Sequence, residues 1–238
     1  MSVLPGHTLI TWLDADQNTM SVPADAGARA IEFYAAGITR QPSKYPHRKH
    51  YEGRYWCAAT GKHVWHESMA EYYSLMWLDH QRDLKVIGAQ PMHIIFEDGT
   101  AHYPDFFALL ADGSRVMYDV RPLARITEEV AATFAKTEKL CARIGWDYEV
   151  LTGLATVQRH NLEVISGSRH PRYRPNAEIA ERFLEFLAEP RSLIDTTRRL
   201  DLRGPAAHIH TLYNLMWQRR ILFDTTIPLS NTTTLWSN

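Results

Sequence analysis

Two short segments place an acidic residue inside apolar sequence. Asp105 lies between Pro104 and a pair of phenylalanines, and Asp119 lies in the run Val-Met-Tyr-Asp-Val that ends at Val120. Burying a lone charge is costly, so carboxylates with apolar neighbours of this kind need a partner or a metal. If the two segments are neighbouring strands, the two carboxylates can share Mg²⁺, which prefers oxygen ligands. The alternative is that both are strand-edge or turn acids in ordinary salt bridges.

A cation and a third acid accompany this pair. Arg121 lies two residues after Asp119, so in a strand both side chains project from the same face. A guanidinium there can stabilise charge on a phosphate. Glu67 and Glu71 are four residues apart in a segment with helical spacing, so they share a helix face. Such an acidic pocket predicts metal-dependent phosphodiester hydrolysis, with Mg²⁺ as the cofactor and Mn²⁺ as a substitute.

The elements expected to position these residues form an α/β arrangement. Apolar spacing predicts a helix over 63–80. Two Asp-Gly turns, at 98–99 and 112–113, predict an antiparallel meander, because Asp-Gly supplies the positive φ of a tight turn. Its strands are 92–96, 101–110 and 114–120. A helix capped by Thr127 and ended by Gly145, a strand over 146–151 and a helix over 157–166 complete a sheet with helices on its faces.

Weaker patterns flank this part of the chain. Residues 8–12 and 19–22 suggest short strands, and 28–36 fits either a helix or a strand. The stretch 167–175, rich in Pro, Gly and Arg, predicts a linker. Three helices and a hairpin are expected after it, which is the winged-helix plan; the helices span 178–188, 192–200 and 205–219, and the hairpin joins 220–223 to 227–229.

Composition limits the class of protein. The chain has 238 residues and a formal net charge of −1, so it is not a uniformly basic nucleic-acid coat protein. No apolar run reaches the roughly 18 residues of a membrane span, and the start lacks the pattern of a secretion signal. Its two cysteines lie far apart, which favours reduced thiols in the cytoplasm over a disulfide or zinc framework.

Basic residues gather in two places despite the balanced total. The segment 40–50 contains no acid, and a second cluster lies within 168–174. Either cluster could be a solvated loop, but beside a nuclease pocket such residues would hold DNA phosphates without selecting sequence. The residues predicted to contact DNA are Arg40, Lys44, Arg48, Lys49, Arg54, Arg169 and Arg172.

A longer string of motifs resembles a known family. It comprises Thr60-Gly61-Lys62, Glu67 to Glu71, Gln90-Pro91, Pro104-Asp105-Phe106 and Asp119-Val120-Arg121-Pro122. Together they resemble the TnsA-like endonuclease subunits of heteromeric transposases, within the PD-(D/E)xK nuclease superfamily, over roughly residues 40–175. The resemblance implies a restriction-endonuclease-like mixed sheet flanked by helices. It assigns residues 1–40 to an N-terminal arm or small strands, 41–167 to the nuclease domain and 176–238 to a winged-helix-like domain.

The resemblance also implies roles. Asp105 matches the central metal-binding aspartate, Glu71 matches the helix glutamate with Glu67 as the second choice, and Asp119 falls on the middle position. Arg121 falls on the lysine position, a departure, because a guanidinium does not lose its proton and would act by charge alone. The implied reaction cuts one strand of double-stranded DNA at transposon ends, beside a partner transposase and an ATPase regulator. Two alternatives stay open: a restriction or repair nuclease of the same superfamily, and a non-catalytic DNA-binding or assembly subunit.

Overall fold

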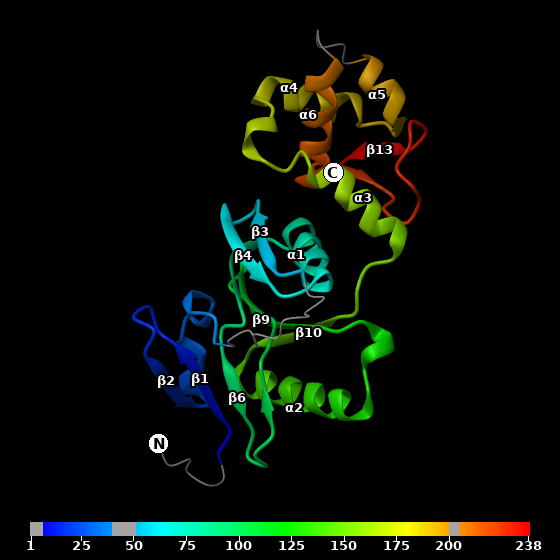
Figure 1. Ribbon diagram of the computed structural model, residues 1–238. Coiled ribbons are helices and arrows are strands. Elements are labelled where there is room, and N and C mark those ends of the chain that lie inside the picture. Colours follow the sequence, from blue (N-terminus) through cyan, green and yellow to red (C-terminus); the bar gives the residue numbers. More distant parts are fainter. Residues whose placement is uncertain (1–6, 40–50, 200–204) are drawn as a thin grey trace. The chain divides into compact units, whose positions relative to one another are not determined.

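The protein, as a computed structural model that describes residues 7–39, 51–199 and 205–238, is a mixed α/β structure. It divides into two compact units (Figure 1). The first unit comprises residues up to 75 together with 82–153, and the second comprises 76–81 and 154–238. No helix in the described part of the chain is long and apolar enough to cross a membrane.

One sheet of the first unit positions the candidate residues. Its strand order is β10-β9-β8-β5, in which β9 and β10 are parallel and the other neighbours are antiparallel. Parallel neighbours need a crossover connection, and the helix α2 (Glu128–Ile144) supplies it between β9 and β10. The strands are β5 (Leu84–Ala89), β8 (Phe106–Leu110), β9 (Arg115–Val120) and β10 (Asp147–Leu151).

The predicted ends of α2 are confirmed. The Thr127 hydroxyl accepts a hydrogen bond from the Val130 N–H, and the acids Glu128 and Glu129 occupy the first turn, where the helix dipole favours them. Gly145 ends the helix at φ 85°, a left-handed conformation that glycine adopts without steric cost. These local signals fix where α2 begins and ends.

A second, antiparallel sheet shares the core of the first unit. Its order is β2-β1-β6-β7. Phe107 of β8 is fully buried at the centre of this core, with its ring against those of Phe33 and Trp146. The strands are β1 (Leu9–Leu13), β2 (Thr19–Pro23), β6 (His93–Ile95) and β7 (Ala101–His102). Two 3-10 helices follow β2 in the chain, η1 (Ala26–Ala30) and η2 (Phe33–Ala35). The strands predicted over 8–12 and 19–22 are therefore confirmed.

The helix predicted over 63–80 is wrong in its first part. Residues Lys62–His66 form the strand β4, which pairs with β3 (Gly53–Cys57) in a hairpin, and the helix α1 begins at Met69 and ends at Gln81. The burial of β4 alternates, with Val64 and His66 buried and Lys62 exposed. A period of two and a period of 3.6 both fit so short an apolar pattern, and pairing with β3 decided between them.

The single strand predicted over 101–110 is also wrong. The chain leaves β7 after His102 and enters β8 at Phe106, and the two strands lie in different sheets. Pro104 lacks the N–H that a continuous strand would use. Asp105 therefore lies just before β8, and the expected three-strand meander becomes two hairpins in two sheets. The strand β5 was not predicted at all.

In its described residues, the second unit contains four α-helices, the end of α1 and a small sheet. The sheet has the order β11-β13-β12, with both pairs antiparallel. The helices are α3 (Thr156–Ser166), α4 (Ala177–Phe186), α5 (Leu193–Arg199) and α6 (Pro205–Trp217), and the strands are β11 (Arg191–Ser192), β12 (Ile221–Phe223) and β13 (Thr234–Ser237).

Two details of the second unit differ from expectation. The strand β12 pairs with β13 at the end of the chain, so the predicted hairpin partner 227–229 is wrong. Residues 225–229 instead contact the side chain of Asn161 on α3. The predicted linker contains a short 3-10 helix, η4 (Pro171–Tyr173).

A buried histidine makes the second unit sensitive to acid. His80 is 4% exposed, and its Nδ1 lies 3.0 Å from the Trp217 carbonyl oxygen. Burial lowers the pKa of His80 to about 4, and Arg219 adds to this effect, although the Trp217 carbonyl and Asp79 act to raise the pKa. The unfolded chain takes up a proton at about pH 6.5 and the folded chain does not, so stability falls between about pH 6.5 and 4.

We expect protonation of His80 in the unfolded chain to lower the free energy of unfolding by about 3 kcal/mol between pH 7 and pH 4. Urea unfolding at pH 7 and pH 4 should show the wild type losing about that much more free energy of unfolding than His80→Gln, which cannot titrate. Equal losses in the two proteins would contradict this effect of burial.

Candidate functional site

One cleft of the first unit contains the four acids and the cation that the sequence singled out. It has a volume of about 1060 Å³ and is lined by Glu67, Glu71, Asp105, Asp119 and Arg121. The start of α2 and the end of β7 complete its walls, through Glu129, Phe134 and His102 among others. Residues far apart in the sequence thus converge where β8 begins and β9 ends. The second cation of the cleft, Arg125, follows Arg121 by one turn.

Asp105 is fixed to the end of β9 by backbone contacts. Its N–H donates to the Tyr118 carbonyl at 3.1 Å, and its Oδ2 accepts from the Val120 N–H at 2.7 Å. Its own carbonyl accepts from the Gln90 N–H at 2.8 Å, where β5 ends. The irregular backbone after Pro104 therefore places the Asp105 carboxylate beside the strand that carries Asp119.

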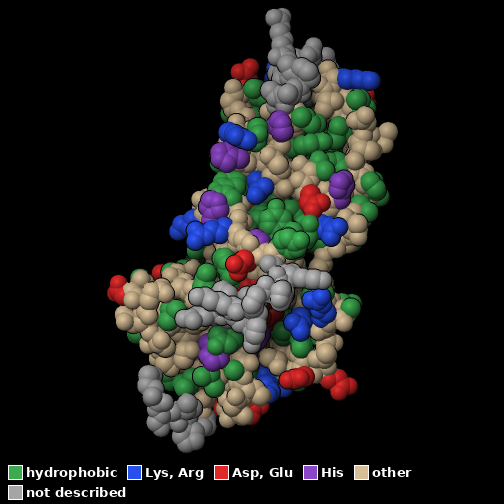
Figure 2. Space-filling view, viewed as in Figure 1, with side chains coloured by type: hydrophobic (Ala, Val, Ile, Leu, Met, Phe, Trp, Pro, Cys, Tyr) green, Lys and Arg blue, Asp and Glu red, His purple; other side chains and the backbone are tan. Residues whose placement is uncertain are grey.

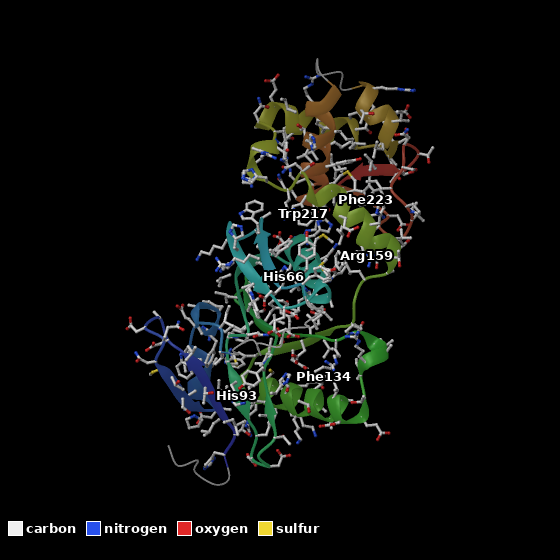
Figure 3. The ribbon with its side chains drawn as sticks, viewed as in Figure 1. His66, His93, Phe134, Arg159, Trp217 and Phe223 are labelled. Carbon is white, nitrogen blue, oxygen red and sulfur yellow. The ribbon has the colours of Figure 1, made fainter. Side chains whose placement is uncertain are left out.

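Asp119 is the most buried acid of the cleft and is held by two side chains. It is 3% exposed, and its Oδ2 accepts hydrogen bonds from the Tyr148 hydroxyl at 2.5 Å and from His102 Nε2 at 2.8 Å. Burial, and then the neighbouring Asp119 carboxylate, raise the pKa of Tyr148, so its hydroxyl stays protonated and donates. The ring of Phe134 on α2, which is labelled in Figure 3, lies 6.3 Å from the His102 ring and 6.3 Å from the Tyr148 ring.

Glu71 has a structural role at the start of α1. Its Oε2 accepts from the Glu67 N–H at 2.7 Å and its Oε1 from the Ser68 hydroxyl at 2.8 Å, while the Ser68 Oγ accepts from the Glu71 N–H at 3.2 Å. This reciprocal pattern is a variant of the capping box, in which Ser and Glu satisfy the free N–H groups of the first turn. Glu71 is 8% exposed, so its carboxylate is buried at the edge of the cleft.

Arg121 lies directly after β9 and is exposed. Its Nε donates to the Arg125 carbonyl at 3.2 Å, which bends the guanidinium along η3 (Leu123–Arg125). The expected strand geometry, with Arg121 and Asp119 on one face of a continuing strand, is therefore modified because β9 ends at Val120. The guanidinium groups of both arginines that line the cleft can attract a phosphate.

The donor chemistry of the cleft suits a hard divalent ion. Its acids offer only carboxylate oxygens, which are the ligands that Mg²⁺ and Mn²⁺ prefer. Within the described residues, however, no three Asp, Glu, His or Cys side chains are grouped closely enough to form a complete metal site. Asp105 and Asp119 are the acids best placed to hold an ion, with Glu71 tied to its helix cap.

The residues predicted to contact DNA are distributed over both units. Arg54 is exposed on β3 in the first unit. In the second unit, Arg169 donates to the Ser166 carbonyl at 2.7 Å, and Arg172 lies over the Tyr173 ring at 4.6 Å. On the face drawn in Figure 2, Lys and Arg side chains are interspersed with acidic and apolar ones. Arg40, Lys44, Arg48 and Lys49 lie outside the described residues.

Two functional neighbours were missed from the sequence. His102 and Tyr148 both contact Asp119, yet they lie 17 and 29 residues from it. His102 was visible as a polar residue two positions before Pro104, and Tyr148 lay in a strand that was predicted. Tyr148 reaches Asp119 through the parallel register of β9 and β10, in which Val150 pairs with Asp119, and His102 reaches it from β7 in the other sheet. Nothing in the spacing of the sequence determines that register.

No protein-family model matches the chain, and no curated protein matches it in sequence.

Proposed function

We propose that this chain is a Mg²⁺-dependent DNA endonuclease with a PD-(D/E)xK-like centre. The observation that carries the proposal is the shared cleft, in which the Asp105 carboxylate accepts the Val120 N–H one residue beyond Asp119. This hydrogen bond brings Asp105, just before β8, next to Asp119 near the end of β9. Two neighbouring carboxylates can bind a metal ion, and the arginines that line the cleft can bind the phosphate of a phosphodiester.

The order of elements around the cleft supports the same proposal. A helix (α1) is followed by three antiparallel strands (β5, β8 and β9), a crossover helix (α2) and a parallel strand (β10). This is the arrangement that the resemblance implies for a restriction-endonuclease-like core, with the helix glutamate on the first helix. The β6–β7 hairpin between β5 and β8 is an insertion into that order.

The residues of the cleft would have different roles in the proposed reaction. Asp105 and Asp119 would hold the divalent ion, and Glu71 or its neighbour Glu67 would complete the acidic pocket. When bound, the ion would polarise the phosphodiester and lower the pKa of a bound water. Arg121 and Arg125 would attract and orient the phosphate, and neither can serve as a base, because a guanidinium keeps its proton.

The role in transposition is the narrower part of the proposal and depends on the motif resemblance. It assigns the chain to the cytoplasm, cutting one strand at transposon ends beside a partner transposase and an ATPase regulator. The buried thiols of Cys57 and Cys141, which form no disulfide, fit a reducing compartment. A restriction or repair nuclease would use the same chemistry without those partners.

Cleavage of DNA by the purified chain tests the proposal. Supercoiled plasmid and an end-labelled duplex would be incubated with Mg²⁺, Mn²⁺, Ca²⁺ or chelator, alone and with a candidate transposase from the same genome. We expect nicking in Mg²⁺ or Mn²⁺ and none with chelator. Absence of cleavage in every condition, together with no binding of Mn²⁺ by calorimetry, would contradict the proposal.

A second candidate is a DNA-binding subunit that does not cut. It is favoured by two observations, the use of the Glu71 carboxylate in a helix cap and the arginine at the lysine position. This candidate predicts DNA binding that is independent of divalent ions. The calorimetric titration with Mn²⁺ separates the two candidates.

Either candidate predicts phosphate contacts by exposed arginines. Arg172→Ala should weaken duplex binding about equally for all sequences and reduce the slope of log K against log salt by about 1, as for one lost phosphate contact. The control is Arg82→Ala, whose guanidinium is paired with Glu149 at 2.7 Å in the first unit. A salt slope that Arg172→Ala leaves unchanged would remove Arg172 from the DNA contacts.

A further inference from the structure

Among the described residues, hydrogen bonds to the Asp119 carboxylate reach one of its oxygens only. Its Oδ2 accepts two hydrogen bonds, at 2.5 Å from the Tyr148 hydroxyl and at 2.8 Å from His102 Nε2. Within the described part of the chain its Oδ1 accepts none. Because the side chain is 4% exposed, water cannot readily replace either donor. We call His102 and Tyr148 the Asp119 clamp.

The Asp119 clamp is rigid because three elements hold it. Tyr148 lies on β10, which pairs in parallel with β9, and His102 ends β7, which pairs with β6. The Phe134 ring of α2 lies 6.3 Å from the His102 ring and 6.3 Å from the Tyr148 ring, so it limits the movement of both. Turning the carboxylate to expose both oxygens would break two buried hydrogen bonds, which is costly when donors are left unpaired.

We infer that His102 and Tyr148 make Asp119 a one-oxygen ligand, and that they thereby select Mg²⁺ and Mn²⁺ over Ca²⁺ in this cleft. The inference rests on the proposed function, since it assumes that the cleft takes a divalent ion. Mg²⁺ requires octahedral geometry from single oxygens and retains several waters, whereas Ca²⁺ takes six to eight oxygens and often a carboxylate in bidentate fashion. A carboxylate with one oxygen occupied cannot bind in the bidentate mode.

Removing one hydroxyl tests the inference. Tyr148→Phe keeps the ring against Phe134 but removes one of the two donors to the Asp119 Oδ2. By calorimetry we expect its affinity for Mn²⁺ to fall about tenfold, as for a lost outer-shell partner, while its affinity for Ca²⁺ is unchanged or higher. The ratio of the two affinities should therefore fall. General damage to the fold would lower both affinities together and leave the ratio unchanged.

A matched control removes a similar hydroxyl elsewhere. Tyr34→Phe deletes a tyrosine hydroxyl that donates to the Glu32 carboxylate at 2.9 Å and does not line the cleft. Its Mn²⁺-to-Ca²⁺ ratio should match that of the wild type.

The histidine side of the clamp gives an independent test by rescue. His102→Gln retains an N–H that can donate to Asp119, and His102→Leu does not, so glutamine should preserve the affinity ratio and leucine should lower it. If His102→Gln lowers the affinity ratio as much as His102→Leu does, donation of a hydrogen bond by His102 is not what sets the ratio, and the inference is overturned. If the wild type binds Mn²⁺ and Tyr148→Phe has the same ratio of Mn²⁺ to Ca²⁺ affinity as the wild type, the inference is wrong while the proposed metal centre stands. If the wild type binds no divalent ion, the proposed metal centre fails with it.

Discussion

Replacing Asp119 by asparagine is expected to lower the rate of DNA cleavage by about a thousandfold or more, since a metal-held phosphodiester relies on several kcal/mol of charge stabilisation and each 1.4 kcal/mol is about tenfold in rate. The asparagine carbonyl can still accept hydrogen bonds from Tyr148 and His102. The substitution also removes a charge from a side chain that is 3% exposed, so the fold should survive it.

Asp112→Asn is the control for this loss. Asp112 lies in the turn between β8 and β9, at the far end of the same strands, where its Oδ1 accepts from the Ser114 N–H at 2.8 Å. The chemical change is identical, but the cleft is untouched, and cleavage should stay within about twofold of the wild type, as for a surface substitution. Asp119→Asn would be measured by single-turnover cleavage in Mg²⁺ alongside its melting temperature.

The outcome distinguishes two roles of Asp119. Loss of cleavage with an unchanged melting temperature supports a metal role for Asp119. Full cleavage by Asp119→Asn, with the wild type active, would instead place the reaction at other residues and leave Asp119 as a buried structural acid held by Tyr148 and His102.

Local chemistry explains why some elements were predictable. The helix α2 was located because Thr127 caps its first turn and Gly145 adopts a left-handed conformation at its end. The turns at Gly99 and Gly113 were located for the same reason, since φ is 81° and 92° there and only glycine adopts such angles freely. In each case the residues that make the contact are close in sequence.

Pairing between distant segments explains what was missed. The strand β4 was taken as part of a helix because its apolar pattern is short, and its partner β3 decides its conformation. The strand β5 pairs with β8, yet a run of six residues containing Gly88 gives a weak strand signal. A side chain at Gly88 would meet the Tyr34 backbone at 2.7 Å, so this glycine is required by close packing, not by a turn.

In the candidate site too, contacts between residues close in sequence could be predicted and contacts between distant segments could not. Asp105 and Asp119 could be proposed as neighbours because a tight turn joins the segments that carry them, and the Val120–Asp105 hydrogen bond agrees with that geometry. The capping role of Glu71 was also available in the sequence, because Ser68 precedes it by three residues. The convergence of His102 and Tyr148 on Asp119 was not, because it follows from the packing of separate strands and α2.

The largest expected loss of stability in the second unit comes from Asn161 of α3. This side chain is fully buried, its Nδ2 donates to the carbonyls of Thr225 at 3.0 Å and Ile227 at 2.8 Å, and its Oδ1 accepts from the Leu229 N–H at 2.9 Å. Three hydrogen bonds thus fix the chain between β12 and β13 to a helix 64–68 residues earlier. Each is worth about 1 kcal/mol, so Asn161→Leu, which nearly preserves volume, should cost about 3 kcal/mol.

Asn161→Asp should be the more damaging change, although it is nearly isosteric. Its carboxylate would retain the acceptor for the Leu229 N–H but would face two carbonyl oxygens without a hydrogen to share, and an uncompensated buried charge is severely destabilising. Native-state amide exchange of peptides from α3 and α6 would measure the second unit by itself. Asn231→Ala, an exposed site in the same connection, should change the free energy by no more than about 0.5 kcal/mol. If aspartate were tolerated better than leucine, the two Nδ2 hydrogen bonds could not be what holds this connection in place.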